Sequence, residues 1–342
     1  MKKRMLSGKR LFPVRRGRII STARRQRMRD LCAVLLFLLL LPYVCSLLFG
    51  RNISKETGDV FDGDEQGIYV NIPVEGGRRE IPAEEYLTGA LAASIPVECQ
   101  EETLKAQAVI LRTMCVYTYQ NMTDGGSDYS EGKTDRISIS AEDIGQKYLD
   151  EQQLRSLWGM SYDANMEKIN AAVSGTKELY MADAGRAVEP AYFWLSAGRT
   201  RSGEEVLGEA YAHLVSVECS HDIQADDYDS RVSITEEKFW RILGTDKQSG
   251  ISLTRDSAGY VLWVEYGEEK MSGEKFRSLF SLNSSCFTLT AGEGKVEIVC
   301  RGVGHGLGFC QYDADRRAKE GMDYISLLKI YFQNIELESN VV

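Results

Sequence analysis

Apolar residues recur at helical spacing over residues 101–119, where Leu104, Ala108, Leu111 and Cys115 form one stripe. Three more apolar residues face other sides of the same helix: Ala106, Val109 and Ile110. A helix that is apolar on several sides is usually buried. The pattern therefore predicts a long helix in the centre of the fold.

The segment before this helix reads as a hairpin followed by a shorter helix. Residues 68–73 (IYVNIP) alternate like a strand, and residues 79–81 can pair back after a Gly-Gly turn. Pro82 opens a helix, because proline suits the first helical position and acidic residues follow it. Pro96 ends that helix.

The rest of the chain mixes both kinds of element. A polar loop covers residues 123–136, and helices are expected at 141–155 and at 163–173, the second opening with Asp163 as its N-cap. Strands are then predicted at 173–180, 191–196, 212–217, 259–264, 286–289 and 295–300. Two last helices are predicted at 313–321 and 323–333. This mixed order predicts an α+β fold.

Residues 31–50 contain no charge and are long enough to span a bilayer as a helix. Arginines stand on the N-terminal side, which predicts a cytoplasmic N-terminus. The sequence thus divides into a basic tail at 1–30, a transmembrane anchor at 31–50, a linker at 51–67 and a domain at 68–342. We expect a single-pass cell-membrane protein with residues 51–342 outside the cell; a cleaved signal peptide is the alternative.

Charge is distributed unevenly. Residues 1–30 carry about +11, so a chain with a total of −9 leaves −20 for the remainder. An acidic domain argues against nucleic acid as its partner. Two of the eight cysteines lie in the apolar segment, and the other six, none of them in a CxxC pair, permit disulfides or are buried thiols. They are Cys99, Cys115, Cys219, Cys286, Cys300 and Cys310.

Three motifs contain candidate site residues. Lys105, Gln107 and Arg112 are polar residues on the helix predicted to be buried, so each is either paired or faces a site. Residues 301–312 (RGVGHGLGFCQY) set four glycines around one histidine, and glycine permits close backbone approach. The candidates in the glycine motif are His305, Gln311 and Tyr312, and those in the tight turn at 196–200 are Ser196, Gly198 and Thr200.

Taken together, EEYLTGALAASIP, ETLKAQAVILRT, WLSAGRT and GVGHGLGFCQYDA resemble the stage II sporulation protein D / amidase-enhancer LytB family. The resemblance covers about residues 68–338. It implies a membrane protein of the sporulation engulfment machinery that acts on peptidoglycan as a lytic transglycosylase. Such enzymes cut glycan strands that a partner amidase has stripped of stem peptides, and other members enhance amidases. A glutamic acid protonates the glycosidic oxygen, and a 1,6-anhydro ring closes.

The sequence departs from the family pattern in two places. The catalytic glutamate of the resemblance aligns with Ser94, whose hydroxyl cannot act as a general acid at neutral pH. The His/Cys/Cys zinc site of some members has no counterpart, because residues 122–148 contain neither His nor Cys although Gln146 and Tyr148 are kept. We expect no metal and no cofactor.

Three functions stay open at this point. The first is a degenerate enzyme that binds denuded glycan strands, or scaffolds and stimulates an amidase, using the polar residues named above. The second is an active lytic transglycosylase in which Glu98 replaces the missing acid. The third is thiol chemistry by Cys310 with His305.

Overall fold

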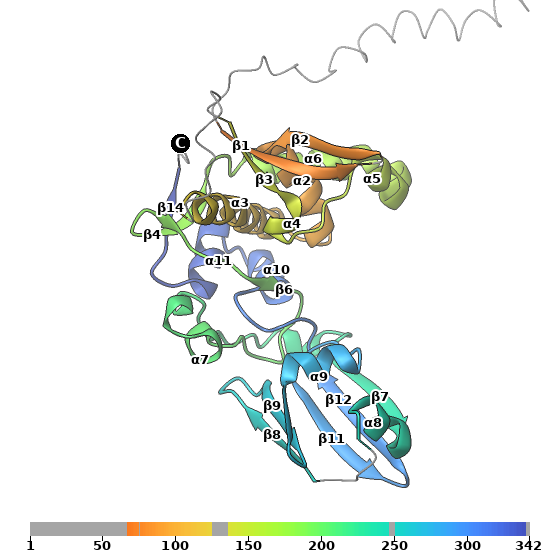
Figure 1. Ribbon diagram of the computed structural model, residues 1–342. Coiled ribbons are helices and arrows are strands. Elements are labelled where there is room, and N and C mark those ends of the chain that lie inside the picture. The colour runs from red at the N-terminus through yellow and green to blue at the C-terminus, as the bar shows by residue number, and fades with distance from the viewer. Residues whose placement is uncertain (1–66, 75, 125–135, 246–249, 340–342) are drawn as a thin grey trace, which may run out of the picture. The chain divides into compact units, whose positions relative to one another are not determined.

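The computed structural model describes residues 67–74, 76–124, 136–245 and 250–339 (Figure 1). The predicted tail at 1–30, the anchor at 31–50 and the linker at 51–67, apart from Gly67, lie outside these residues. Within the described ranges, no helix is both long and apolar enough to cross a membrane. The anchor and its orientation therefore stay predictions.

The first part of the fold is a three-stranded sheet backed by helices. Strand β1 (Gly67–Val74) pairs antiparallel with β2 (Gly77–Pro82) and parallel with β3 (Arg136–Ser140). Helix α2 (Ala83–Ser94) starts directly after Pro82, as predicted. Its buried face packs with the sheet, with α3 (Glu101–Asp124) and with α6 (Tyr162–Ser174) around one apolar core.

Helix α3 is central, as its apolar pattern predicted, because a second core covers its other side (Figure 1). Ala106, Val109 and Ile110 pack there against α10 (Gln311–Lys319) and α11 (Tyr324–Tyr331). Two small sheets complete this part, in the orders β14-β4-β5 and β13-β6. Their strands are β4 (Tyr180–Asp183), β5 (Arg186–Ala187), β6 (Tyr192–Phe193), β13 (Phe309–Cys310) and β14 (Glu336–Glu338).

Residues 229–301 form a lobe with a core of its own. Two three-stranded sheets, ordered β11-β12-β7 and β10-β9-β8, enclose stacked aromatic rings that include Phe239, Phe276 and Phe287. The elements are β7 (Asp229–Thr235), α8 (Glu236–Ile242), β8 (Ile251–Arg255), β9 (Val261–Tyr266), β10 (Glu269–Ser272), α9 (Gly273–Leu279), β11 (Phe287–Gly292) and β12 (Lys295–Arg301). The predicted strands at 259–264, 286–289 and 295–300 correspond to β9, β11 and β12, and the α+β class is confirmed.

Several predicted elements were wrong. The helix at 141–155 is two helices, α4 (Ala141–Ile144) and α5 (Glu151–Trp158), because Gly145 has a left-handed φ of 72° that ends α4. Residues 173–179 are the end of α6 and a turn rather than a strand, and β4 begins only at Tyr180. The N-cap of α6 is Ser161 rather than Asp163.

The strand predicted at 212–217 is also absent from the described residues, where Leu214 makes one isolated bridge to Phe332. Short helical turns join the remaining parts: η1 (Gly159–Ser161), α7 (Gly203–Leu207), η2 (Glu209–Tyr211) and η3 (Asp222–Gln224). Leu214 and its neighbours connect these turns to the helices of the second core.

Candidate functional site

Ser94, the position of the missing acid, is the last residue of α2. Ile95 is extended, as expected before Pro96. The half-buried Ser94 side chain donates to the Leu91 carbonyl (Oγ–O 3.1 Å) and lies near the Tyr192 hydroxyl. Among the described residues, no carboxyl group takes part in the hydrogen bonds of this side chain.

Gln311 joins two sequence motifs at this point. Its Nε2 donates to the Ser94 carbonyl at 2.9 Å and to Oε1 of Gln107 at 3.1 Å. Both glutamines are buried, and Nε2 of Gln107 has no partner in the described part of the chain. The structure therefore brings Ser94, Gln107 and Gln311 together from α2, α3 and α10.

The turn between α2 and α3 is fixed by contacts from two other helices. Lys168 on α6 donates its Nζ to the carbonyls of Val97 (2.6 Å) and Cys99 (2.7 Å). Asp315 on α10 accepts from the backbone N–H of Gln100 at 2.7 Å. Glu98, the candidate substitute acid, lies on this turn and is exposed to solvent.

The segment around β6 forms the centre of the site, which the sequence analysis missed. The Tyr192 hydroxyl donates to Oε1 of Gln146, and burial raises the pKa of Tyr192 to about 12. The Trp194 carbonyl accepts from the backbone of Tyr312 at 2.9 Å, and their rings meet edge to face at 5.8 Å. The alternation of AYFWL predicted a strand but gave no sign that Tyr192 bonds Gln146 or that Trp194 packs against Tyr312.

A cavity of about 620 Å³ adjoins these residues at Gln146 and Tyr148. This volume lies in the range of small-molecule sites. The Tyr148 ring stacks on Tyr86 at 5.6 Å, so part of the cavity wall is held by the core beneath it. Gln146 links this cavity to Tyr192, because it lines the cavity and its Oε1 accepts from the Tyr192 hydroxyl.

His305 is held by the backbone around it. Its Nδ1 accepts from the Leu307 N–H at 3.1 Å, and its ring packs 5.6 Å from the Phe193 ring. Burial lowers the pKa of His305, which favours the neutral ring. These contacts place His305 in the wall of the site next to β6. None of them is with a group that could exchange a proton with the ring.

The glycines of residues 302–308 approach the protein's own chain. Gly304 and Gly308 have φ of 118° and 74°, and a Cβ would lie 2.6 Å from the Phe193 Cβ and 2.2 Å from the Ala191 carbonyl oxygen. The loop can follow the segment before and through β6 because these positions lack side chains. We expected the glycines to permit close approach of the backbone. In the structure, the glycine loop approaches residues 191–195 of the same chain.

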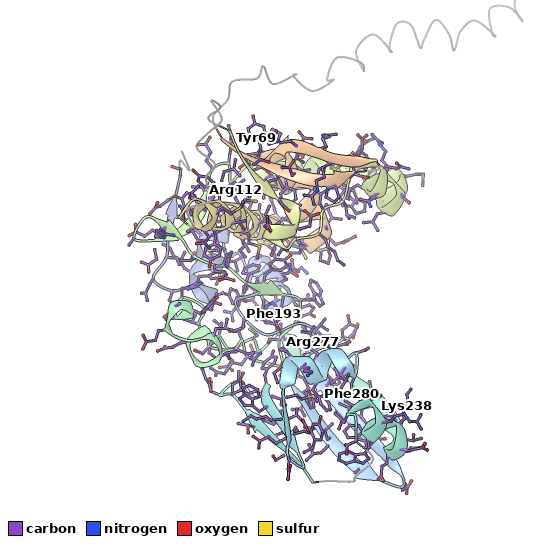
Figure 2. The ribbon with its side chains drawn as sticks, viewed as in Figure 1. Tyr69, Arg112, Phe193, Lys238, Arg277 and Phe280 are labelled. Carbon is purple, nitrogen blue, oxygen red and sulfur yellow. The ribbon has the colours of Figure 1, made fainter. Side chains whose placement is uncertain are left out.

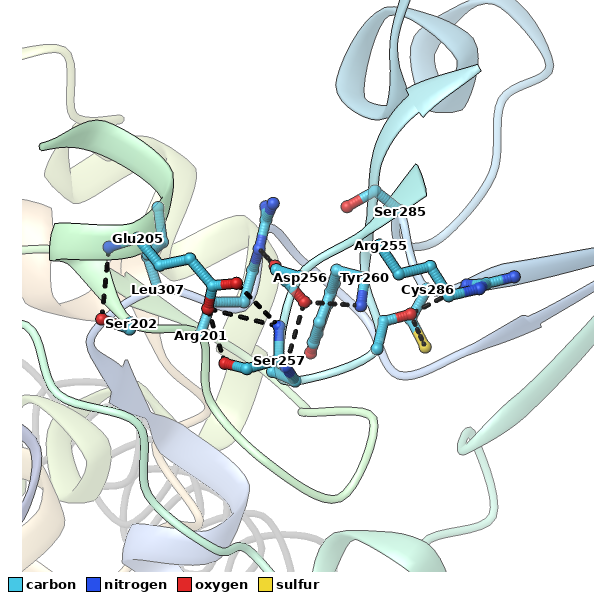
Figure 3. A network of polar contacts seen from close by, with 12 residues as sticks. Arg201, Ser202, Glu205, Arg255, Asp256, Ser257, Tyr260, Ser285, Cys286 and Leu307 are labelled. Atoms are coloured by element: carbon cyan, nitrogen blue, oxygen red, sulfur yellow. Dashed lines mark hydrogen bonds and ion pairs between the residues drawn. The ribbon is translucent and has the colours of Figure 1, made fainter. Parts of the chain in front are cut away.

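A buried network fixes the other side of this loop (Figure 3). Arg201 donates its Nε to Oδ2 of Asp256 at 2.6 Å, its Nη1 to the His305 carbonyl at 3.2 Å, and its backbone N–H to the Gly306 carbonyl at 2.7 Å. Its guanidinium lies 5.1 Å from the centre of the Tyr260 ring. Residues of the 229–301 lobe thus position the glycine loop.

The candidates in the turn at 196–200 are mostly buried within the fold. The Ser196 backbone N–H donates to Oδ2 of Asp222 at 2.7 Å, and the Gly198 N–H donates to the Ser196 hydroxyl at 3.1 Å. Thr200 bonds Val215 and Val217 through its hydroxyl. Since Ser196 and Thr200 are fully buried, their contacts support a positioning role for the turn.

Arg112 and Lys105 are paired in the structure. Arg112, marked in Figure 2, makes a two-pronged pair with Glu84 (2.6 and 2.9 Å) and also donates to carbonyls of α6 and of the turn before β4. Lys105 pairs with Glu101 and Glu102 at 2.8 Å each. Arg112 is buried, so its geometry supports a structural role, whereas Lys105 keeps partial exposure.

The thiol hypothesis does not fit the geometry. The fully buried Sγ of Cys310 lies 3.0 Å from Oδ2 of Asp222 and 3.7 Å from the Trp194 carbonyl, and its contacts do not include His305. Burial raises the pKa of the Cys310 thiol well above its usual value. A nucleophilic thiolate requires the opposite shift.

Comparison with known proteins agrees with the sequence motifs. Residues 76–182 match the SpoIID family model, described as stage II sporulation protein. The chain is 27% identical to stage II sporulation protein D of Bacillus subtilis over 325 residues, which cover 90% of this chain and 93% of that protein. It is 28% identical to the protein of the same name from Bacillus amyloliquefaciens, over 75% of this chain and 74% of that protein.

An uncharacterised protein of Brachyspira hyodysenteriae is 24% identical over 75% of this chain and 67% of its own length. The matched segment 76–182 contains α2, α3 and α6, and so includes Ser94, Gln107 and the turn between them. The resemblance predicted from the motifs is confirmed: the chain carries a SpoIID domain at residues 76–182 and is similar to stage II sporulation protein D over most of its length.

Proposed function

We propose that this protein binds peptidoglycan glycan strands from which stem peptides have been removed, without cutting them, and that it scaffolds or stimulates an amidase. The observation that carries the proposal is Ser94 at the end of α2, where the family resemblance requires a glutamic acid. Glycoside cleavage needs a general acid beside the scissile oxygen. The hydroxyl of Ser94 cannot supply one.

The carboxyl groups on the neighbouring helices support this proposal, because they are engaged in ion pairs and backbone hydrogen bonds. Asp315 accepts from the Gln100 backbone and pairs with Lys319, which fixes the turn after α2. Glu102 pairs with Lys105 and accepts from the Tyr324 backbone at 2.9 Å. General acids in glycosidases are usually partly buried, and Glu98 is exposed.

A sugar-binding role is supported by side chains next to Gln311, whose amide holds the Ser94 carbonyl. Trp194 and Tyr312 present half-buried aromatic rings, and Gln146 contributes an amide at the adjoining cavity. Aromatic rings provide apolar contact for the C–H faces of sugars, and an amide can both donate and accept hydrogen bonds. This surface lies where α10 and β6 meet.

Replacing Trp194 by alanine should weaken binding of denuded strands about tenfold, which corresponds to about 1.4 kcal/mol. The loss follows from removal of one aromatic contact surface where β6 meets α10. Binding is measured with the full chain in mild detergent by fluorescence anisotropy of labelled strands prepared with an amidase. Strands that keep their stem peptides are measured alongside.

The matched control is Trp263→Ala, which removes an exposed tryptophan of β9 that packs against Lys270 in the separate lobe. This variant should bind as the unchanged protein does. Equal binding by all three proteins, or no binding of strands by any of them, would contradict the assignment of this surface to glycan.

The alternative is a lytic transglycosylase that uses Glu98. This alternative is favoured only by the place of Glu98 on the turn that follows Ser94. Under our proposal neither the unsubstituted full chain nor a Glu98→Gln variant forms 1,6-anhydro ends on denuded strands, because that carboxyl has no catalytic part. Formation of 1,6-anhydro ends by the unsubstituted protein, together with their loss in Glu98→Gln, would establish Glu98 as the acid and contradict the proposal.

The cellular setting is part of the same proposal. Residues 31–50 anchor the protein in the cell membrane with the N-terminus in the cytoplasm and residues 51–342 outside, where peptidoglycan lies. The negative charge of the domain argues against nucleic acid as a partner. The family resemblance supports cell-wall polymer and membrane-bound partners, among them an amidase.

A further inference from the structure

Three side chains of the metal-ligating kind meet in the interior, outside the contacts of Ser94. They are Cys219, Asp222 and Cys310, and one ligand atom from each lies within 4.8 Å of the other two. All three residues are buried. Among the described residues, this is the one such group of three or more.

One oxygen of this cluster has no hydrogen-bond partner. Oδ2 of Asp222 accepts from the Ser196 N–H at 2.7 Å and lies 3.0 Å from the Sγ of Cys310. Oδ1 of Asp222 has no hydrogen-bond partner in the described part of the chain, although Asp222 is fully buried. Leaving a buried carboxylate oxygen unpaired is unfavourable, so this oxygen is free to bind a ligand.

We propose that Cys219, Asp222 and Cys310 bind a zinc ion. Two thiolates select a soft or borderline metal over Mg²⁺ or Ca²⁺, and zinc accepts two sulfurs and a carboxylate oxygen in a tetrahedral site. With Zn–S bonds of about 2.3 Å, neighbouring ligand atoms stand roughly 3.5–3.8 Å apart, which the observed spacing allows. Three protein ligands leave a fourth position for water.

Metal binding at this place would be coupled to proton release. Burial raises the pKa of Asp222 to about 6, and it raises the pKa of Cys310 well above its usual value. A bound divalent cation reverses this effect, because it stabilises the anionic ligands. Binding at neutral pH therefore releases the two thiol protons to solvent.

Hydrogen bonds fix the backbone around the ligands. The Cys219 N–H donates to the Gly198 carbonyl at 3.0 Å. Arg317 donates its Nη2 to the Glu218 carbonyl at 2.9 Å and pairs with Asp313 at 2.6 Å. His221 is occupied by Asp313 and Glu320 at 2.8 and 3.2 Å, so it is not counted as a ligand.

The position of the ion would matter for the site. Cys310 directly precedes Gln311, whose amide holds the Ser94 carbonyl. Asp222 holds the Ser196 turn. Zinc would therefore join the turn at 196–200 to the start of α10. This inference does not depend on the proposed glycan binding and replaces our expectation that the protein needs no metal.

The test uses the full chain, purified in detergent with a non-thiol reductant and without chelators. We expect about one Zn²⁺ per chain, and after exchange with Co²⁺ we expect thiolate-to-cobalt absorption in the near ultraviolet. Both should be lost in Cys219→Ser and Cys310→Ser, and both should persist in Cys286→Ser, which changes a half-buried cysteine outside the cluster. Asp222→Asn should weaken Co²⁺ binding while leaving a thiolate band.

The unsubstituted protein gives an independent readout, should a cysteine variant fail to fold. Zinc bound to the native state raises the melting temperature, and a chelator should lower it reversibly. Absence of stoichiometric metal and of the thiolate band, or a band that persists in both cysteine variants, would overturn the proposal. A disulfide between Cys219 and Cys310 in protein purified without reductant would overturn it as well.

Discussion

Replacing Ser94 by glutamate is expected to produce a protein that cuts denuded glycan strands and leaves 1,6-anhydromuramic ends. A general acid contributes about 10²–10⁴-fold to such a reaction, so product formation should rise at least roughly 100-fold above the unchanged protein. The products are counted by mass spectrometry after incubation of the full chain with amidase-treated strands.

The location of residue 94 favours this result. A carboxyl group at the last position of α2 faces the negative end of the helix dipole, and Ser94 is half-buried beside Tyr192. Both effects raise the pKa of a carboxyl group, as an acid that must stay protonated near neutral pH requires. The Gln311 amide would still hold the backbone at this point.

Ser94→Gln is the matched control, because glutamine has nearly the size of glutamate and carries no acidic proton. It should leave the strands intact. If Ser94→Glu folds with an unchanged melting temperature and still makes no anhydro ends, the missing carboxyl is not the whole defect. Cutting by both variants would show that another group serves as the acid.

Replacing Gly308 by alanine is expected to destabilise the protein strongly. The residue has φ of 74°, and a Cβ would stand 2.2 Å from the Ala191 carbonyl oxygen, at the start of the β13–β6 pairing. A left-handed backbone costs about 1–2 kcal/mol for alanine, and forced repacking adds about 1–3 kcal/mol. A total of about 3 kcal/mol corresponds to a melting temperature roughly 6–12 °C lower.

Gly294→Ala separates the two contributions. Gly294 has nearly the same φ, 73°, but no atom lies within 4 Å of the position its Cβ would take. This variant should show only the smaller backbone cost. Calorimetry of both variants measures the difference, and equal melting temperatures would contradict the close packing of the glycine loop on residues 191–195.

The local part of the fold could be predicted from the sequence. Pro82 and Pro96 bracket α2, and the apolar positions around Leu104 and Leu111 identify α3 as central, because both signals act within a few turns of helix. The break at Gly145 was missed, because the residues around it look helical and their pattern does not show that this glycine adopts a left-handed φ. The separate core of residues 229–301 was missed because it arises from contacts between strands far apart in the chain.

The candidate site could be predicted only in part for a related reason. The motifs led to Ser94, Gln107 and Gln311, which do meet. Arg112 shares a motif with them, but its pair with Glu84 is visible only once α2 and α3 are packed. Tyr192 and Trp194 read as strand residues, and the cluster at Asp222 joins residues whose spacing gives no metal motif.

The central claim, that the natural protein binds denuded strands and does not cut them, is tested most directly on the full chain without substitutions. It is incubated with amidase-treated strands, the bound and free strands are separated, and 1,6-anhydromuramic ends are counted in both by mass spectrometry. The proposal predicts strands retained by the protein with no increase in these ends. An increase above the protein-free sample would contradict it and would show that a carboxyl group other than one at residue 94 performs the cut.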